Sequence, residues 1–257
     1  MTGMPAATPA QAAAEFRVGQ VFSRAWTVLS ANVGKFLALT AITALPDLAI
    51  LIPGLSDPET MRQAATNISP SALLAGGATS LVWGILIVIT HATVLYGAFQ
   101  VMRGQSFQIG DSLQKGLARF FAVIGTSICM VIAMMFGFIL LIIPGFILLS
   151  MFYVALPACV VERLGPFQSL GRSGDLTKGH RWKIFGIWLV LGIVGGIVNN
   201  IIGGVLGAAG VAITLVVSMV WHALLSAYQA ITVAVAYHDL RVAKEGVDIE
   251  HIAAVFD

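Results

Sequence analysis

The chain has 257 residues, of which 58% are hydrophobic and only 10% charged, and its formal net charge is +2. A soluble domain carries about a quarter of its residues as charged ones, so this chain cannot cover a water-facing surface of its size. The small net charge argues against nucleic-acid binding. Cys129 and Cys159 both lie in apolar runs, which argues against a disulfide framework or a zinc site. The composition therefore predicts an all-α polytopic membrane protein.

The two ends of the chain differ from the apolar middle. Residues 1–15 are rich in Ala, Pro, Thr and Gln and contain one charged residue, Glu15. They lack the basic and apolar regions of a signal peptide, so we expect a disordered cytoplasmic tail. Residues 16–240 are expected to form one membrane domain, and residues 241–257 an acidic cytoplasmic tail.

Six segments are long and apolar enough to be considered as transmembrane helices, since a span needs about 20 mostly apolar residues. They are residues 35–52, 73–101, 120–143, 146–161, 184–207 and 211–237. The first contains Pro46 and is expected to be kinked. An uncharged turn at Pro144-Gly145 joins the third and fourth, so residues 120–161 could instead form a re-entrant hairpin. Both alternatives stay open at this point.

Basic residues are distributed unevenly along this six-span arrangement. Thirteen of the 14 lie in the tails and loops of one side, and Arg62 alone lies in a loop of the other. Loops rich in Lys and Arg stay in the cytoplasm, so the N- and C-termini are both expected to be cytoplasmic.

An amphipathic helix is predicted before the first span, near residues 16–33. Apolar residues recur there at helical spacing, while the basic and amide side chains occupy another face. A shift of 148 positions places Arg24 on Arg172 and Lys35 on Lys183, and similar helices are expected near residues 107–117 and 165–178. We therefore predict three repeats, each an interfacial helix in the lipid headgroup plane followed by a transmembrane hairpin.

Residues 143–183 carry the most specific motifs. They contain the Pro144-Gly145 turn, Glu162 at the end of the next span, and a Ser-x-x-Leu-x-x-Gly element at Ser173, Leu176 and Gly179. This stretch resembles the membrane domain attached to some glycerophosphoryl diester phosphodiesterases and the related YciC-like proteins of bacterial inner membranes. The resemblance implies a helical inner-membrane domain. It implies no catalytic residue, because Trp182 follows His180-Arg181 where the phosphodiesterase barrel has glycine.

Three ionisable residues are predicted to lie at membrane depth: Asp47, His91 and His222. Such residues are expensive to bury and commonly mark ion or proton paths. Neutral His residues bonded to neighbouring helices would explain the same pattern without transport.

Two small-xxx-small spacings occur late in the chain, at Gly192 with Gly196 and at Gly203 with Gly207. Glycines at this spacing let another helix approach closely. We expect them to serve helix packing, either within the bundle or against a second copy of the chain.

Basic residues gather before the fifth span, and they suggest a site for anionic lipid headgroups. The predicted headgroup-binding residues are Arg172, Lys178, Arg181 and Lys183, together with Arg24 and Trp182. Each basic residue near the membrane surface contributes about 1 kcal/mol toward anionic lipid. The alternative is that these charges only fix the topology.

The expected function is that of a non-catalytic integral protein of the bacterial inner membrane, which organises lipid or acts as an accessory subunit through its interfacial helices. The alternative is a small transporter or channel that uses Asp47, His91 and His222. No nucleophile–base, metal-ligand or phosphate-loop motif occurs, so we expect no enzymatic activity, no cofactor and no metal. The expected partners are membrane lipids, preferably anionic, and a membrane protein or a second copy, but no nucleic acid.

Reporter fusions test the predicted topology. With six spans, a reporter placed after Arg62 and one placed after Glu245 should report opposite sides of the membrane, because an odd number of spans separates them. Detection of both reporters on the same side would contradict the six-span arrangement.

Overall fold

The computed structural model describes residues 16–44, 70–206 and 210–246, and every regular element in these ranges is helical. The α-helices are α1 (Val18–Ala31), α2 (Val33–Ala41), α5 (Pro70–Met102), α6 (Ile109–Ala118), α7 (Phe120–Leu140), α8 (Ile142–Met151), α9 (Ala155–Val161), α10 (Pro166–Thr177), α11 (Arg181–Ile201) and α12 (Val211–Glu245). A short 3-10 helix, η2 (Ile42–Ala44), follows α2, and a π-helical turn, η3 (Ile202–Leu206), follows α11.

Within the described residues, five helical segments are long and apolar enough to cross a membrane. They are Gly76–Met102, Phe120–Leu140, Ile142–Val161, Arg181–Leu206 and Ile213–Glu245. The chain therefore has the character of a multi-pass membrane protein, as its composition predicts. The first predicted span, 35–52, is helical as far as Ala44, and the rest of it lies outside the described residues. This span, and with it a total of six, stays a prediction.

The turn between α7 and α8 lies three residues earlier than predicted. Leu141 has extended backbone (φ −168°, ψ 154°) and separates the two helices. Pro144 is already the third residue of α8, where a backbone N–H has no acceptor within the helix and proline is tolerated. Gly145 serves the close approach of the two helices, because a Cβ there would lie 2.4 Å from the ring of Phe138. The prediction of a turn at Pro144-Gly145 is wrong for this reason.

The fourth predicted span is interrupted, since α8 ends at Met151 and α9 begins at Ala155. Pro157 explains the interruption, because it has no N–H for the carbonyl of Tyr153 and its ring would collide with that carbonyl in a continuous helix. Backbone groups freed inside a segment that is apolar enough to span a membrane need partners within the protein. Ser173 of α10 supplies them: its Oγ donates to the carbonyl of Met151 at 2.7 Å and accepts from the N–H of Val154 at 3.3 Å.

Three basic side chains connect the amphipathic helices α1, α6 and α10, and we call these contacts the basic ring. The helices α2, α7 and α11 directly follow α1, α6 and α10 in the chain, and each provides one of the three side chains at its beginning. Each side chain donates to a backbone carbonyl that lies two residues before the start of a different amphipathic helix. The hydrogen bonds run from Lys35 Nζ to the Phe107 oxygen (2.7 Å), from Arg119 Nη2 to the Leu164 oxygen (3.1 Å) and from Lys183 Nζ to the Phe16 oxygen (3.0 Å). The contacts lead from α2 to α6, from α7 to α10 and from α11 back to α1.

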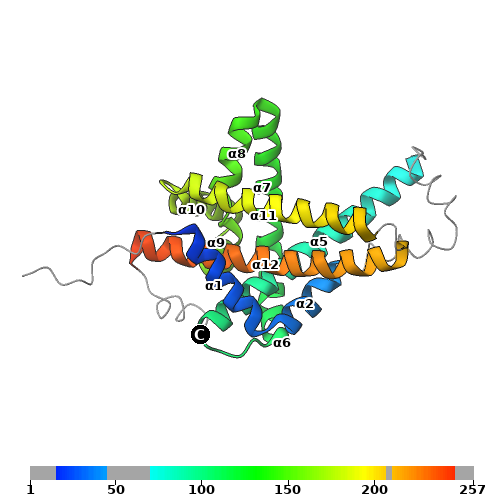
Figure 1. The fold of residues 1–257 in the computed structure, drawn as a ribbon. Coiled ribbons are helices and arrows are strands. Elements are labelled where there is room, and N and C mark those ends of the chain that lie inside the picture. Colours follow the sequence, from blue (N-terminus) through cyan, green and yellow to red (C-terminus); the bar gives the residue numbers. More distant parts are fainter. Residues whose placement is uncertain (1–15, 45–69, 207–209, 247–257) are drawn as a thin grey trace, which may run out of the picture.

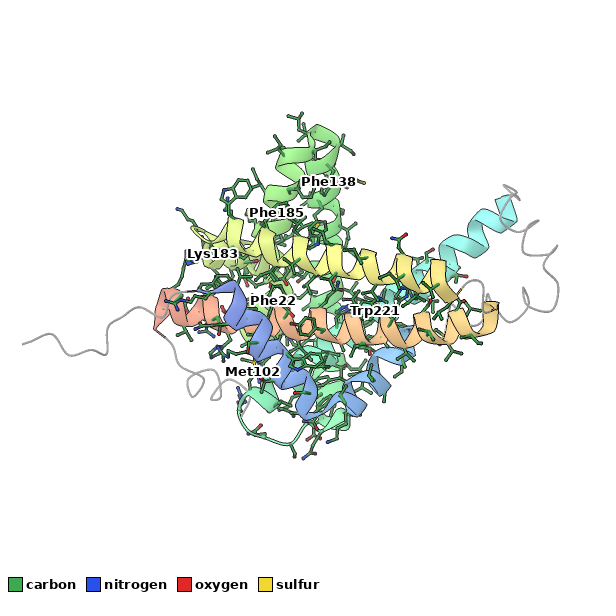
Figure 2. All side chains as sticks on the ribbon, viewed as in Figure 1. Phe22, Met102, Phe138, Lys183, Phe185 and Trp221 are labelled. Atoms are coloured by element: carbon green, nitrogen blue, oxygen red, sulfur yellow. The ribbon has the colours of Figure 1, made fainter. Side chains whose placement is uncertain are left out.

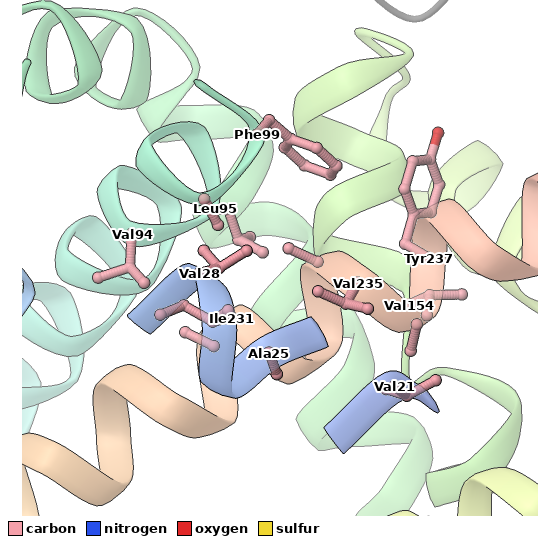
Figure 3. Packing of buried hydrophobic residues seen from close by; sticks show 14 of the residues in the cluster. Val21, Ala25, Val28, Val94, Leu95, Phe99, Val154, Ile231, Val235 and Tyr237 are labelled. Carbon is pink, nitrogen blue, oxygen red and sulfur yellow. The ribbon is translucent and has the colours of Figure 1, made fainter. Parts of the chain in front are cut away.

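The amphipathic helices also bury their apolar faces in the same cyclic order. Helix α6 packs on α5, α10 packs on α9, and α1 packs on α12. On α1, Val21, Ala25 and Val28 lie on one face and pack in the core beside Ile231 and Val235 of α12 (Figure 3). The core therefore lies where the amphipathic helices meet the ends of the long helices.

The hairpin of α7 and α8 extends away from this core. It runs up the view of Figure 1, whereas α11 and α12 run across it. Its tip is apolar and exposed, since residues 139–143 each keep at least 67% of their surface accessible. An apolar patch of this kind needs lipid or another protein to cover it. Whether the hairpin is two full spans or re-entrant stays an open prediction.

The basic ring predicts a stabilising role for Lys183. Replacing it by Met (Lys183→Met) leaves the carbonyl of buried Phe16 without its charged donor, which should cost about 1–3 kcal/mol of unfolding free energy. Thermal unfolding in detergent should therefore begin at a lower temperature. The matched control is Lys178→Met, at an exposed position, and equal melting temperatures for the two variants would contradict the role of the ring.

Candidate lipid-binding site

A groove of about 410 Å³ lies between α8 and α11. Its lining residues are Ile143, Phe146, Ile147, Ser150, Arg181, Trp182 and Phe185. Phe185 projects from α11 on the side of the α7–α8 hairpin (Figure 2) and its ring lies 5.3 Å from that of Phe146. Ser150 Oγ donates to the carbonyl of Phe146 at 3.0 Å. The groove therefore has an apolar, aromatic wall and one cationic group.

Arg181 supplies that cationic group at the first residue of α11. Its Nε is buried and has no hydrogen-bond partner among the described residues. An unpaired buried N–H is costly, and phosphate oxygens are among the strongest acceptors for a guanidinium. The beginning of α11 adds to this preference, because His180 provides no side-chain cap and the first N–H groups of a helix favour an anion.

Two further residues of the predicted headgroup site, Trp182 and Lys178, lie close to Arg181 in the sequence. Trp182 is 85% exposed, and its ring lies 6.0 Å from that of Phe185. Tryptophan is enriched at the level of lipid headgroups. Lys178 is exposed and lies three residues before Arg181. Burial lowers the pKa of the intervening His180, and the positive charge of Lys183 lowers it further.

Arg172 has protein partners for its charge. Its Nε donates to both carboxylate oxygens of Glu162, at 2.9 and 2.8 Å, and its Nη2 lies 2.5 Å from Glu245 Oε1. Burial alone would lower the pKa of Arg172, but the two carboxylates outweigh it and raise that pKa. We therefore assign Arg172 to the contact between α10, the end of α9 and α12, in place of the predicted headgroup site.

The same carboxylates bind two residues of α12, which completes what we call the Glu162 cluster: Glu162, Arg172, Tyr237, Arg241 and Glu245. The hydroxyl of Tyr237 donates to Glu162 at 2.7 Å, and Arg241 Nε donates to Glu245 at 3.0 Å. Two carboxylates and two guanidinium groups balance in charge. The cluster therefore attracts an anionic headgroup far less than its two arginines would by themselves.

Arg24 and Lys183 are also held by the protein. Arg24 forms an ion pair with Asp239 of α12, whose carboxylate also contacts His238 Nδ1 at 3.0 Å. Lys183 belongs to the basic ring. Of the six predicted headgroup residues, Arg181 and Trp182 line the groove. Lys178 is exposed and lies three residues before Arg181, whereas Arg24, Arg172 and Lys183 form contacts inside the fold. Their partners lie far away in the sequence, so spacing could not indicate them.

The residues predicted at membrane depth do not meet in one site. His91 Nδ1 lies 2.9 Å from the carbonyl of Ile87 one turn earlier, and His222 Nε2 lies 3.3 Å from Asn199 Oδ1 at the surface. The cavity beside His91 does not include His222. Asp47 lies outside the described residues. Among the residues that the structure places, no three His, Cys, Asp or Glu side chains gather in a way that could hold a metal ion.

The glycine spacings do not serve packing within the chain as predicted. At Gly192, Gly196 and Gly203, an added Cβ would meet no other atom of the described residues within 4 Å, so no described helix approaches them closely. The close approach occurs at Gly195, where a Cβ would lie 2.9 Å from Leu225. Gly207 lies outside the described residues. Packing against a second copy stays a prediction.

Residues 59–240 match the family model described as "Domain of unknown function (DUF7847)", and the chain belongs to this family. The matched region contains the groove, the helix interruption and most of the Glu162 cluster. No curated protein and no solved structure matches the chain. The comparisons give no link to glycerophosphoryl diester phosphodiesterases or YciC-like proteins.

The Glu162 cluster predicts strong coupling between its members. Arg172→Met should lower the unfolding free energy by about 2 kcal/mol, because it leaves Glu162 and Glu245 without their shared donor. The double variant Glu162→Gln/Arg172→Met should lose less than the sum of the two single losses. Denaturation in detergent of the unmodified protein, the two single variants and the double variant gives the coupling free energy between Glu162 and Arg172. Strictly additive losses of unfolding free energy would show that this ion pair contributes nothing.

Proposed function

We propose that this chain is a non-catalytic integral membrane protein that binds an anionic lipid in the groove between α8 and α11. The observation that carries the proposal is the buried Nε of Arg181, which has no acceptor among the described residues at the end of an aromatic-lined groove. A lipid phosphate supplies the missing acceptor, and one acyl chain covers the apolar wall. Trp182 lies at the headgroup level beside it.

The groove suits a lipid better than a soluble ligand. Its wall contains the rings of Phe146, Trp182 and Phe185, in contact at 5.3 Å (Phe146 with Phe185) and 6.0 Å (Trp182 with Phe185), and such a surface gains little from contact with water. The wall belongs to two segments that are long and apolar enough to span a membrane. A bound chain would thus bridge the hairpin α7–α8 and the helix α11, which run in different directions (Figure 1). In this way lipid binding would stabilise the arrangement of these helices.

We also propose the finer architecture: six spans, cytoplasmic termini and three repeated units in a bacterial inner membrane. The helix bounds support the repeat, because α1 and α10 begin 148 positions apart, as do α2 and α11. The cyclic order of the basic ring supports three units. The motif resemblance at residues 143–183 supports the inner membrane. In this arrangement Arg181 lies at the cytoplasmic surface, where anionic headgroups are abundant.

The role of an accessory subunit is compatible with this proposal, and a lipid-exposed tip at residues 139–143 offers a surface for a membrane-protein partner. The transport alternative has no observation in its favour, since His91 and His222 lie in different surroundings. It stays a prediction that depends on Asp47.

Substitution of Arg181 tests the proposed lipid site. Arg181→Gln keeps a polar side chain of similar length but removes the charge and the guanidinium donors. In nanodiscs with equal amounts of phosphatidylglycerol and phosphatidylcholine, native mass spectrometry should show that its preference for phosphatidylglycerol falls by about fivefold or more. High salt should weaken the preference of the unmodified protein, because screening weakens the attraction.

Lys178→Gln is the matched control, because it removes one charge nearby without touching the groove. It should retain most of the preference. Equal losses in the two variants would show that only the general positive charge matters, and an unchanged lipid profile for Arg181→Gln would refute the site.

A further inference from the structure

A second cavity, of about 480 Å³, lies beside the interruption between α8 and α9 and shares no lining residue with the groove. It lies among α5, α7, α9, α11 and α12, beside Tyr153 in the segment between α8 and α9. Its volume is in the range that accommodates small ligands. Most of its lining is apolar, and its hydrogen-bonding side chains are His91, Ser127, Tyr153, Trp188 and Gln229.

Three of these side chains have unused hydrogen-bonding capacity. The hydroxyl of Tyr153 is buried without a partner among the described residues. His91 Nδ1 lies 2.9 Å from a carbonyl oxygen, which can only accept, so Nδ1 carries the proton and Nε2 of the neutral ring is left as an acceptor. Gln229 lines the same cavity, and its side-chain amide has both a donor and an acceptor. Together they offer donors and an acceptor to one occupant.

The cavity is uncharged and opens toward the surface of a candidate spanning helix. No Asp, Glu, Lys or Arg is among the described residues that line it. A charged ligand would lie there without a counter-ion in apolar surroundings, which is strongly unfavourable. On the α11 side, Gly192 is exposed and Trp188 is 39% exposed. A ligand could thus enter sideways from the membrane.

We propose that this cavity binds a neutral lipid with a free hydroxyl and ester carbonyls, of the diacylglycerol class. The hydroxyl donates to His91 Nε2, and the ester carbonyls accept from the Tyr153 hydroxyl and the Gln229 amide. A quinone presents only acceptors and leaves His91 Nε2 unpaired. A lipid phosphate brings a charge that the cavity does not compensate.

Binding of tritiated 1,2-dioctanoylglycerol to the full-length protein in nanodiscs tests the proposal. Unlabelled dioctanoylglycerol should displace the bound label, whereas dioctanoyl phosphatidic acid and decylubiquinone should not at the same concentration. Absence of saturable binding would overturn the proposal. Displacement by phosphatidic acid would also overturn it, because the site would then accept a charge, and displacement by decylubiquinone would identify a quinone site instead.

Two pairs of variants place the binding in this cavity. Tyr153→Phe removes only the unpartnered hydroxyl and should weaken binding by about threefold to tenfold. Tyr228→Phe is its control, since that hydroxyl donates to the Phe22 carbonyl outside the cavity. Gly192→Leu should fill the cavity opening and abolish binding, whereas Gly196→Leu, one turn away and outside the lining, should not. Unchanged binding in Gly192→Leu, or equal losses within either pair, would overturn the assignment.

The test is independent of the anionic-lipid groove. Arg181→Gln should leave dioctanoylglycerol binding unchanged, because Arg181 does not line this cavity. A loss of dioctanoylglycerol binding in Arg181→Gln would mean that the ligand occupies the groove, and the separate neutral-lipid site would be refuted.

Discussion

The bridge from Ser173 to the broken backbone between Met151 and Val154 is the contact on which the proposed sites depend. Pro157 prevents a continuous helix, and an interruption in so apolar a segment needs internal partners for its free N–H and carbonyl groups. Ser173 meets this need and thereby places α10 against the interruption. The loop that results directs Tyr153 into the neutral cavity, and α9 then delivers Glu162 to Arg172 and α12.

The basic ring explains how three amphipathic helices become parts of one fold. Each lysine or arginine satisfies a carbonyl just before a helix, where the backbone has no helical hydrogen bond of its own. A positive charge used in this way is no longer free for a lipid phosphate. The charges of Arg24 and Arg172 are likewise bound within the protein, by ion pairs with Asp239 and Glu162. Arg181 differs because it lines the groove and its buried Nε has no acceptor among the described residues.

Hydropathy and periodicity predict the helices well, because burial in lipid or on a core determines both patterns along the chain. The amphipathic helices α1, α6 and α10 and five of the long apolar segments fall where expected. The ion pairs could not be predicted, since Arg24 and Asp239 lie 215 positions apart and no local pattern connects them. Pro157 indicates an irregular span in the sequence, but its partner Ser173 lies on another helix. The cavity around Tyr153 likewise depends on residues from five helices that lie far apart in the sequence.

The central claim is that Arg181 holds a lipid phosphate at the end of the α8–α11 groove. An experimental structure of the protein in a phosphatidylglycerol bilayer tests it most directly. Our account predicts density for one lipid, with its phosphate within hydrogen-bond distance of the Arg181 guanidinium and an acyl chain along Phe146 and Phe185. An empty groove, or an Arg181 guanidinium fully bonded to carboxylates or carbonyls of the protein, would contradict it.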